Sequence, residues 1–138
     1  MSQIALTVPV GVLTEVGKKT VQRDLARALL SWEGAPDQDI FKSLLWSYLH
    51  ELPRGAQVTA ADEAPRFRVD VTVPAGTMDD ERRAGLVKEV TELVLAAAGL
   101  GADQALRVWV LLHEQPDGTW GAGGRIMRLA DIAGMASN

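Results

Sequence analysis

The stretch WSYLHELPRG (residues 46–55) returns 63 residues later as WVLLHEQPDG (residues 109–118), with six of the ten positions identical and nothing inserted. The shared residues are Trp, Leu, His, Glu, Pro and Gly. A second pair, LTVPVG at 6–11 and VTVPAG at 71–76, repeats at an offset of 65. The chain therefore contains one structural unit twice, and the ten-residue stretch belongs to that unit.

Each copy predicts a β-strand, a helix and a second β-strand, because the apolar residues between the paired segments recur at helical spacing. The expected elements span residues 3–8, 14–32 and 43–51 in the first copy and 66–73, 79–98 and 106–114 in the second. Thr14 and Asp79 suit helix N-caps, since their side-chain oxygens can accept from free amides of the first turn. Gly34 and Gly99 are natural helix ends.

A crossover helix of this length returns the second strand parallel to the first. Two such units predict an α/β (α+β) fold, in which a four-stranded sheet carries both helices on one face. We expect a single domain over residues 1–138. It divides into a first unit (1–55), a linker (56–64) and a second unit with a C-terminal hairpin and tail (65–138). The tail could form a short helix over a neighbouring subunit.

The other face of the sheet has no helices to cover it. Strands such as RVWVLLHE (residues 107–114) are apolar on both sides, as in sheets that are buried on both faces. The missing layer is most simply other copies of the same chain, so the sequence predicts a homo-oligomer. A monomer with an exposed apolar face is the alternative.

The composition narrows the class of protein. The chain has 138 residues, 47% of them hydrophobic, which predicts a folded domain. A net charge of −4 argues against nucleic-acid or anionic-membrane partners. The absence of cysteine excludes disulfides and thiolate chemistry. No apolar run is long enough for a membrane span, and the first residues do not resemble a signal peptide, so we expect a cytoplasmic protein.

The second copy resembles the tautomerase superfamily, which includes 4-oxalocrotonate tautomerase, macrophage migration inhibitory factor, malonate semialdehyde decarboxylase and cis-3-chloroacrylic acid dehalogenase. The resemblance rests on a first strand that ends in a Gly turn, the helical EVTELV, a strand ending at Glu114, and the hairpin WGAGG at 120–124. It covers nearly the whole chain as two fused β-α-β units. It implies a homotrimer with small-molecule pockets at the subunit boundaries and no cofactor.

The family's chemistry depends on an N-terminal proline, whose secondary amine has a lowered pKa in an apolar site. This chain opens Met1-Ser2-Gln3, and Pro65, before the second unit, carries only an amide nitrogen. Removal of Met1 would expose the amine of Ser2, which burial could turn into a base with a lowered pKa. The alternative is that Ser2 is an ordinary start of a strand.

The resemblance also implies arginines that bind substrate carboxylates, but Trp46 and Trp109 occupy one of the expected places. An indole offers an apolar wall and one N–H donor in place of a bidentate cation. Trp120 resembles the aromatic residue that lines the family's pocket, with interface packing as the alternative. Arg125 is the nearest cation for an anionic ligand. The expected substrate is therefore less anionic and more apolar than the family's usual acids.

The repeated histidines, His50 and His113, could move protons near neutral pH, or could cap the sheet and bridge subunits. Strand alternation places His113 on the face of Trp109 and turns Glu114 away, so the adjacent pair is no local dyad. Two histidines without a convergent carboxylate do not predict a metal site.

We therefore expect an isomerase- or lyase-type enzyme that moves a proton on a small, largely apolar carbonyl compound. Ser2, His113 or His50 would be the base, and Trp46, Trp109, Trp120 and Arg125 would bind the substrate. The alternative is a non-catalytic trimeric binding or assembly protein that retains the fold.

Overall fold

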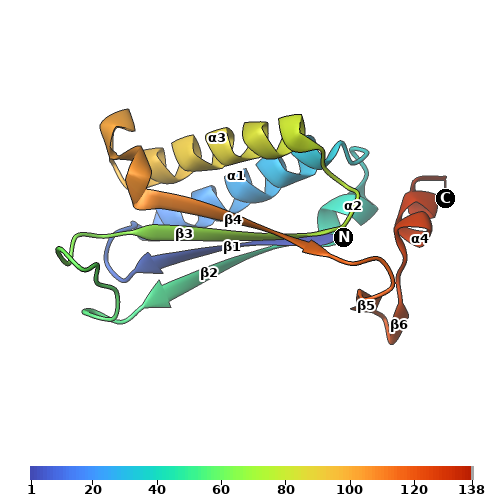
Figure 1. The fold of residues 1–138 in the computed structure, drawn as a ribbon, viewed down its shortest axis with the longest axis horizontal. Coiled ribbons are helices and arrows are strands. Elements are labelled where there is room, and N and C mark those ends of the chain that lie inside the picture. Colours follow the sequence, from blue (N-terminus) through green and yellow to red (C-terminus); the bar gives the residue numbers. More distant parts are fainter. Residues whose placement is uncertain (138) are drawn as a thin grey trace.

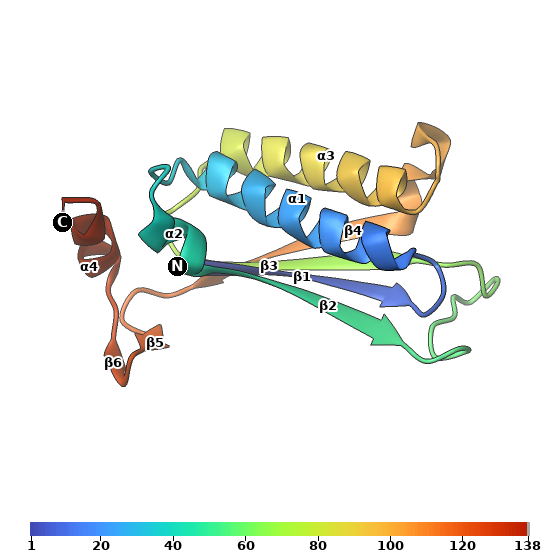
Figure 2. The ribbon, with the colours of Figure 1, turned by 180° about the vertical axis from the view of Figure 1, so that it is seen from behind.

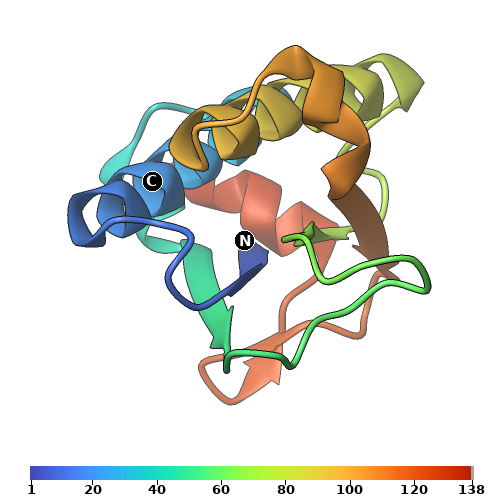
Figure 3. The same ribbon diagram turned by 90° about the vertical axis from the view of Figure 1, so that its left-hand side faces the viewer.

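The computed structural model describes residues 1–137 of the chain. Its main body has two layers, a four-stranded sheet and two long helices that lie on one face of it (Figures 1 and 2). Seen from the end of the strands, both helices lie on the same side of the sheet (Figure 3). This confirms the predicted fold class. No described helix is long and apolar enough to cross a membrane.

The first unit is the predicted strand, helix and strand, with one addition. Its elements are β1 (Ser2–Pro9), α1 (Glu15–Glu33), α2 (Asp39–Ser43) and β2 (Leu45–Leu52). The side chain of Thr14 accepts a hydrogen bond from the amide of Gly17 at 2.9 Å, which confirms the N-cap. Helix α1 ends at Gly34 with a φ of 70°, the left-handed conformation that glycine adopts without strain. The short helix α2 was not predicted.

The second unit repeats this plan. Its elements are β3 (Phe67–Pro74), α3 (Asp80–Ala97), a 3₁₀ turn (Ala102–Arg107) and β4 (Val108–Gln115). Asp79 caps α3 by accepting from the amide of Arg82 at 2.8 Å, as predicted. The 3₁₀ turn takes residues that the prediction gave to the strand, so β4 begins two residues later than expected.

The strand order is β2-β1-β3-β4. Within each unit the two strands are parallel, and β1 and β3 pair antiparallel at the centre of the sheet, where Ala5 lies opposite Asp70. The two units are thus arranged about an approximate two-fold axis through the centre of the sheet. Consequently β1 and β3 begin at opposite ends of the sheet.

The core lies between the sheet and the two helices. Every second residue of the central strands points at the helices and is buried. The helices pack against these residues with apolar side chains spaced three or four residues apart. The completely buried side chains are those of Ile4, Leu6, Leu25, Leu29, Val69, Val71, Leu86, Val90 and Val94.

Helices α1 and α3 approach closely at Gly85. A Cβ atom at this position would overlap with the ring of Trp32, so the close packing needs a residue without a side chain. The indole N–H of Trp32 donates to Glu89 at 3.0 Å, which satisfies its polar group. A glycine in the middle of a helix, otherwise unfavourable, is explained by this contact.

The repeated stretch now has a structural explanation. Its glutamates turn towards the helices, where Glu51 pairs with Lys18 at 2.9 Å and Glu114 pairs with Arg83 at 2.7 Å. Each pair ties the end of the second strand to the first turns of the crossover helix. Its glycines at positions 55 and 118 have φ values of 81° and 84°, so the turn after each strand requires glycine.

The open face of the sheet is less apolar than predicted. The edge strands do expose large apolar side chains, among them Trp46 and Trp109. The central strands instead present Thr7, Arg68 and Asp70, together with Gln3 and Thr72. The apolar character is therefore confined to the two edges, with a polar strip between them, because only β2 and β4 are apolar at their outward positions.

The C-terminal segment extends beyond the end of the sheet (Figure 1). It forms β5 (Gly121–Ala122), β6 (Arg125–Ile126), α4 (Leu129–Gly134) and a 3₁₀ turn (Met135–Ser137). The hairpin and the short helix were both expected. Met127 and Ile132 are buried within the chain itself, so α4 packs on its own subunit near the start of β1.

Candidate functional site

A cavity of about 320 Å³ lies at the N-terminal end of β1. The ends of α1 and α2, the turn after β3 and helix α4 enclose it. Most of its lining is apolar, including Phe41, Leu129 and Ile132, and its ionisable groups are the N-terminal amine of Met1 and the carboxyl of Glu33. We call this the N-terminal cavity.

The two ionisable groups have pKa values displaced in opposite directions. Burial lowers the pKa of the Met1 amino group from its ordinary value of 8.0, against the opposing charge of Glu33. Burial also raises the pKa of the Glu33 carboxyl, against the Ser2 hydroxyl and the charge of the amino group. A weakened base beside a weakened acid is the arrangement that acid–base catalysis uses near neutral pH.

Two neighbouring polar groups at this end of β1, the Ser2 hydroxyl and the Glu33 carboxyl, are not paired by a well-formed hydrogen bond. The hydroxyl oxygen of Ser2 and Oε1 of Glu33 are buried and make no hydrogen bond of ordinary distance and angle. Buried polar groups in proteins are nearly always hydrogen-bonded, so each exception calls for a reason. Here the two unsatisfied groups are neighbours, since the Ser2 hydroxyl is one of the groups that counteract the raised pKa of Glu33.

Ser2 is the first residue of β1 and is 2% exposed. Its side chain points to the helix face, and its amide donates to the carbonyl of Leu44 at 3.2 Å. With Met1 attached, the Ser2 nitrogen is a backbone amide at the start of β1, and it becomes an amine only if Met1 is removed.

His113 lies on the open face, near the same end of the sheet as this cavity, because it pairs with Thr72 and Thr72 pairs with Gln3 of β1. Its Nε2 is 3.0 Å from Oδ1 of Asp70, whose Oδ2 accepts from Nε of Arg68 at 2.8 Å. The prediction that the histidines lack a convergent carboxylate is therefore wrong for His113. Sequence reasoning missed Asp70 and Arg68, although the alternation in RVDV at 68–71 places both on one face of a strand.

His50 has a different environment. Its ring stacks on that of Tyr48 with centroids 6.1 Å apart, and the position equivalent to Asp70 is Ala5. The duplication thus kept both histidines, but only His113 has a carboxylate partner in the described structure. Residues 1–137 contain no group of three or more His, Asp or Glu side chains placed to hold a metal ion.

The predicted tryptophans do not share a pocket within one chain. Trp46 and Trp109 are 57% and 67% exposed, on the opposite edges of the open face and towards opposite ends of the sheet. The indole N–H of Trp46 already donates to the carbonyl of Ser43 at 3.1 Å. Each tryptophan shares its face with the histidine of its own strand, as predicted, but lies four residues away from it.

Trp120 and Arg125 belong to the C-terminal hairpin region. Trp120 is half-buried, and its carbonyl accepts from the amide of Met127 at 2.8 Å. Arg125 is exposed beside a shallow hollow over the glycines of the hairpin. Neither residue lines the N-terminal cavity of its own chain.

Comparisons with known proteins agree with the fold described above. Residues 68–130, just under half of the chain, match the family model described as tautomerase enzyme. A symmetric trimer of a wild-type fused 4-OT is 21% identical, with a TM-score of 0.77 over 94% of this chain and 98% of its own. The chain has the fused 4-OT fold.

Two further solved structures share this fold. Pt0534 inactivated by 2-oxo-3-pentynoate is 23% identical, with a TM-score of 0.78 over 95% of this chain and 97% of its own. N1, a member of the cis-3-chloroacrylic acid dehalogenase family, is 18% identical, with a TM-score of 0.79 over 99% of this chain and 92% of its own. No curated protein matches the chain by sequence. The two structures show a shared fold, and the likeness to the tautomerase family model is that of residues 68–130.

Proposed function

We propose that the chain is a tautomerase-superfamily enzyme that moves a proton on a small, largely apolar carbonyl compound. One observation carries the proposal: an amino group whose pKa is lowered by burial lies in an apolar cavity beside a carboxyl whose pKa is raised by burial. The cavity, about 320 Å³, is at the small end of the range for ligand sites. The tautomerase match of residues 68–130 supports the same class.

In the proposed reaction the N-terminal amine is the base. It removes a proton from the carbon next to the carbonyl, while protonated Glu33 donates its proton to the carbonyl oxygen, so the ketone becomes the enol. Ketonisation runs the same transfers in reverse. The apolar lining supports this division because it favours the neutral forms of both groups.

Either of two residues can supply the amine. With Met1 retained, the amine of Met1 is the base; with Met1 removed, the amine of Ser2 takes this role, as the sequence predicted. An intact-mass measurement decides between them. If the N-terminus is acetylated, neither amine is free and the proposed base is excluded.

The reaction itself is tested with phenylenolpyruvate. Glu33→Gln keeps the shape of the side chain but removes its ionisable proton, so kcat/KM should fall by roughly 10²-fold. Glu92→Gln, on the exposed face of α3, is the matched control and should leave the rate unchanged. His113→Ala tests the histidine as an alternative base. A loss of activity in His113→Ala with none in Glu33→Gln would move the site to the open face.

A covalent probe locates the base directly. The alkynyl ketone 2-oxo-3-pentynoate, which inactivated Pt0534, is an electrophile that a neutral amine can attack. We expect one adduct per chain, located at the N-terminal residue by peptide mapping. An adduct on His50 or His113 instead would contradict the amine as nucleophile.

We also propose that the working form is a homotrimer, as in the fused 4-OT structures. Exposed apolar side chains on both edge strands, Trp46 and Trp109 among them, support coverage of the open face by other copies. In such an assembly Trp46, Trp109, Trp120 and Arg125 would act as binding residues across subunit boundaries. Analytical ultracentrifugation at micromolar concentration checks this, and a stable monomer would contradict it.

A second candidate is a non-catalytic trimeric binding protein. It is favoured by one observation, that the predicted histidines, tryptophans and Arg125 do not gather around the N-terminal cavity of their own chain. Wild-type protein that neither ketonises phenylenolpyruvate nor reacts with 2-oxo-3-pentynoate would support this candidate.

A further inference from the structure

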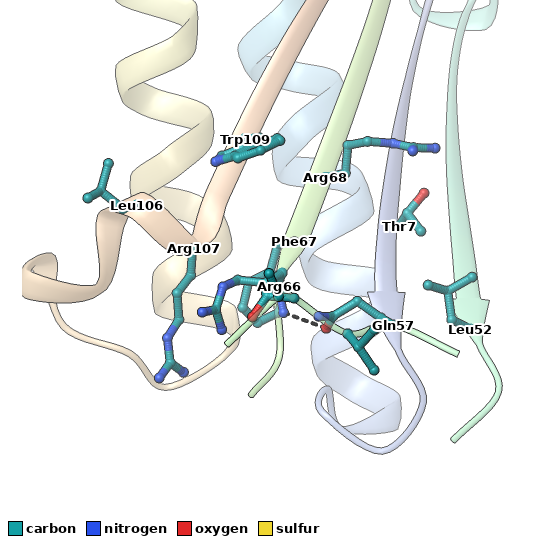
Figure 4. A pocket seen from close by; sticks show the side chains of 12 residues that line it. Thr7, Leu52, Gln57, Arg66, Phe67, Arg68, Leu106, Arg107 and Trp109 are labelled. Atoms are coloured by element: carbon teal, nitrogen blue, oxygen red, sulfur yellow. Dashed lines mark hydrogen bonds between the residues drawn. The ribbon is translucent and has the colours of Figure 1, made fainter. Parts of the chain in front are cut away.

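A second and larger cavity, of about 560 Å³, lies at the opposite end of the sheet from the N-terminal cavity. It lies where β3 and β4 begin, and the linker between the two units forms one of its walls (Figure 4). Three arginines line it: Arg66, Arg68 and Arg107. We call it the linker cavity. Of the residues that the sequence predicts to bind a substrate, only Trp109 lines it.

The arginines of the linker cavity are not fully neutralised. Arg68 is held by Asp70 at 2.8 Å, and Arg66 is 3.4 Å from Asp62. Arg107 makes no ion pair within the described residues. Two carboxylates against three guanidinium groups leave one net positive charge, in a chain whose net charge is −4.

The same cavity gathers exposed apolar side chains. Leu106 is 91% exposed, Trp109 is 67% exposed and Val58 is 60% exposed. Single exposed apolar residues are common, but three around one cavity that also holds an unpaired cation are typical of a binding site. A guanidinium beside an indole and aliphatic groups fits a ligand with an anionic head and an apolar body.

The wall of the cavity is built by an ordered linker. The hydroxyl of Thr59 accepts from the amides of Ala61 and Asp62 at 3.1 and 3.0 Å. The amide of Arg66 donates to the side chain of Gln57 at 2.8 Å, which closes the loop onto the start of β3 (Figure 4). A wall that is already formed binds a ligand without a large loss of conformational entropy.

The positive charge is specific to the second unit. At the repeat offsets of 65 and 63, the counterparts of the three arginines in the first unit are Met1, Gln3 and Leu44, none of which carries a cationic side chain. The tryptophan, by contrast, is present in both units. The fold alone therefore does not require the arginines at this end.

We propose that the linker cavity binds a small organic monoanion, a carboxylate with an aromatic or branched aliphatic body. Arg107 and Arg66 hold the carboxylate, and Trp109 and Leu106 cover the apolar body. Figure 4 shows Arg66 and Arg107 on the Trp109 side of the cavity and Arg68 extending towards Thr7. Arg107 makes no ion pair within the described residues, and Arg66 keeps N–H donors beyond those that contact Asp62 and the carbonyl of Ala64. The single net charge favours a monoanion over a dianion.

Calorimetric titration of the full-length protein with phenylacetate tests this proposal. We expect saturable binding that phenylacetamide, the neutral analogue, does not reproduce. Arg107→Gln should weaken phenylacetate binding at least 10-fold. The matched control is Arg23→Gln, which removes an exposed arginine of α1, on the helix side of the sheet, and should leave the affinity unchanged. Equal binding of phenylacetamide, or an unchanged affinity in Arg107→Gln, would overturn the proposal.

A second measurement places the ligand. In a ¹H–¹⁵N spectrum the indole resonance of Trp109, assigned with Trp109→Phe, should shift on titration, while the resonance of Trp32 should not. Glu33→Gln should bind phenylacetate as the wild type does, because its side chain lies in the N-terminal cavity. Weakened binding in Glu33→Gln with no Trp109 shift would assign the anion to the N-terminal cavity and overturn the proposal. No turnover is measured, so the result is independent of the proposed reaction.

Discussion

The two units share one fold but differ around the residues that precede their first strands, β1 and β3. In the first unit the chain begins in an apolar cavity beside the buried Glu33. In the second unit the positions equivalent to Met1 and Glu33 are Arg66 and Ala98. The helix caps, the turn glycines and the strand-to-helix ion pairs recur in both units. The duplication therefore kept what folds the unit and changed what a ligand would touch.

The open face gives the same lesson. The second unit has an Arg68–Asp70–His113 network, whereas the equivalent first-unit positions are Gln3, Ala5 and His50. A histidine without a carboxylate partner and one with such a partner occupy equivalent strand positions. The residue alone does not decide its chemistry; the neighbouring strand does.

The largest effect is expected in the core, where the two units should behave alike. Leu29 and its counterpart Val94 are both completely buried. Leu29→Ala should lower the free energy of unfolding by about 2–5 kcal/mol, and Val94→Ala by roughly 2 kcal/mol, because each leaves a cavity. Urea titration of both variants should show one cooperative transition. Two separate transitions would mean that the units fold as independent cores.

The next largest effect on stability is expected where the two units differ, at the contact between α1 and α3. Trp32 packs on Gly85, while their counterparts are Ala97 and Thr20. Gly85→Ala should destabilise the protein by about 1–3 kcal/mol, since the added methyl group overlaps with the indole ring. Gly134→Ala, where the methyl group meets nothing within 4 Å, is the control.

A double variant sharpens this test. In Trp32→Ala/Gly85→Ala the overlap is gone, so the loss should be smaller than the sum of the two single losses. Additive losses in thermal and urea unfolding would show that the ring of Trp32 does not press on Gly85.

The pH dependence distinguishes the units through Glu33, whose counterpart is Ala98. Since burial raises the pKa of Glu33 in the folded protein, the folded state binds more protons than the unfolded state above pH 4.5. Stability due to this group is present at low pH and is lost as the pH rises to the folded pKa. Each unit of pKa displacement corresponds to about 1.4 kcal/mol.

Glu33→Gln should therefore gain stability relative to the wild type as the pH increases from 4.5 upward. The lowered pKa of the Met1 amine acts in the opposite sense, since its stability contribution rises with pH up to the unfolded value of 8.0. Urea midpoints measured between pH 4 and 9 check both directions. A difference between the two proteins that does not change with pH would contradict the raised pKa.

The smallest effect is expected from the network on the open face. Asp70→Asn breaks the contacts to Arg68 and His113, but the Asp70 side chain is 27% exposed, so the loss should stay below about 1 kcal/mol in the isolated chain. If other copies cover the face, the loss should grow with protein concentration. Unfolding at two concentrations separates these outcomes.

Much of the fold could be predicted because the relevant signals are local. The caps Thr14 and Asp79, the stop at Gly34 and the alternating strands depend on neighbouring residues, and each was placed within a residue or two. Helix α2 was missed because its five residues are too short for a periodic pattern.

The sites could be predicted only in part because they depend on contacts between distant segments. The partnership of Asp70 with His113 joins two strands 43 residues apart. Glu33 lies beside the start of the chain because α1 runs back along the sheet and ends there. Arg66, Arg68 and Arg107 were given no role from the sequence, and only the register of β3 and β4 brings them to one cavity.

The antiparallel pairing of β1 with β3 has one more consequence. It separates the two cavities by the length of an eight-residue strand, about 26 Å at 3.3 Å per residue. At that distance a ligand in one cavity neither competes with nor sterically excludes a ligand in the other. Mutations in the lining of one cavity can therefore accumulate without changing the other cavity. A duplicated unit can in this way acquire two separate binding specificities in a single polypeptide.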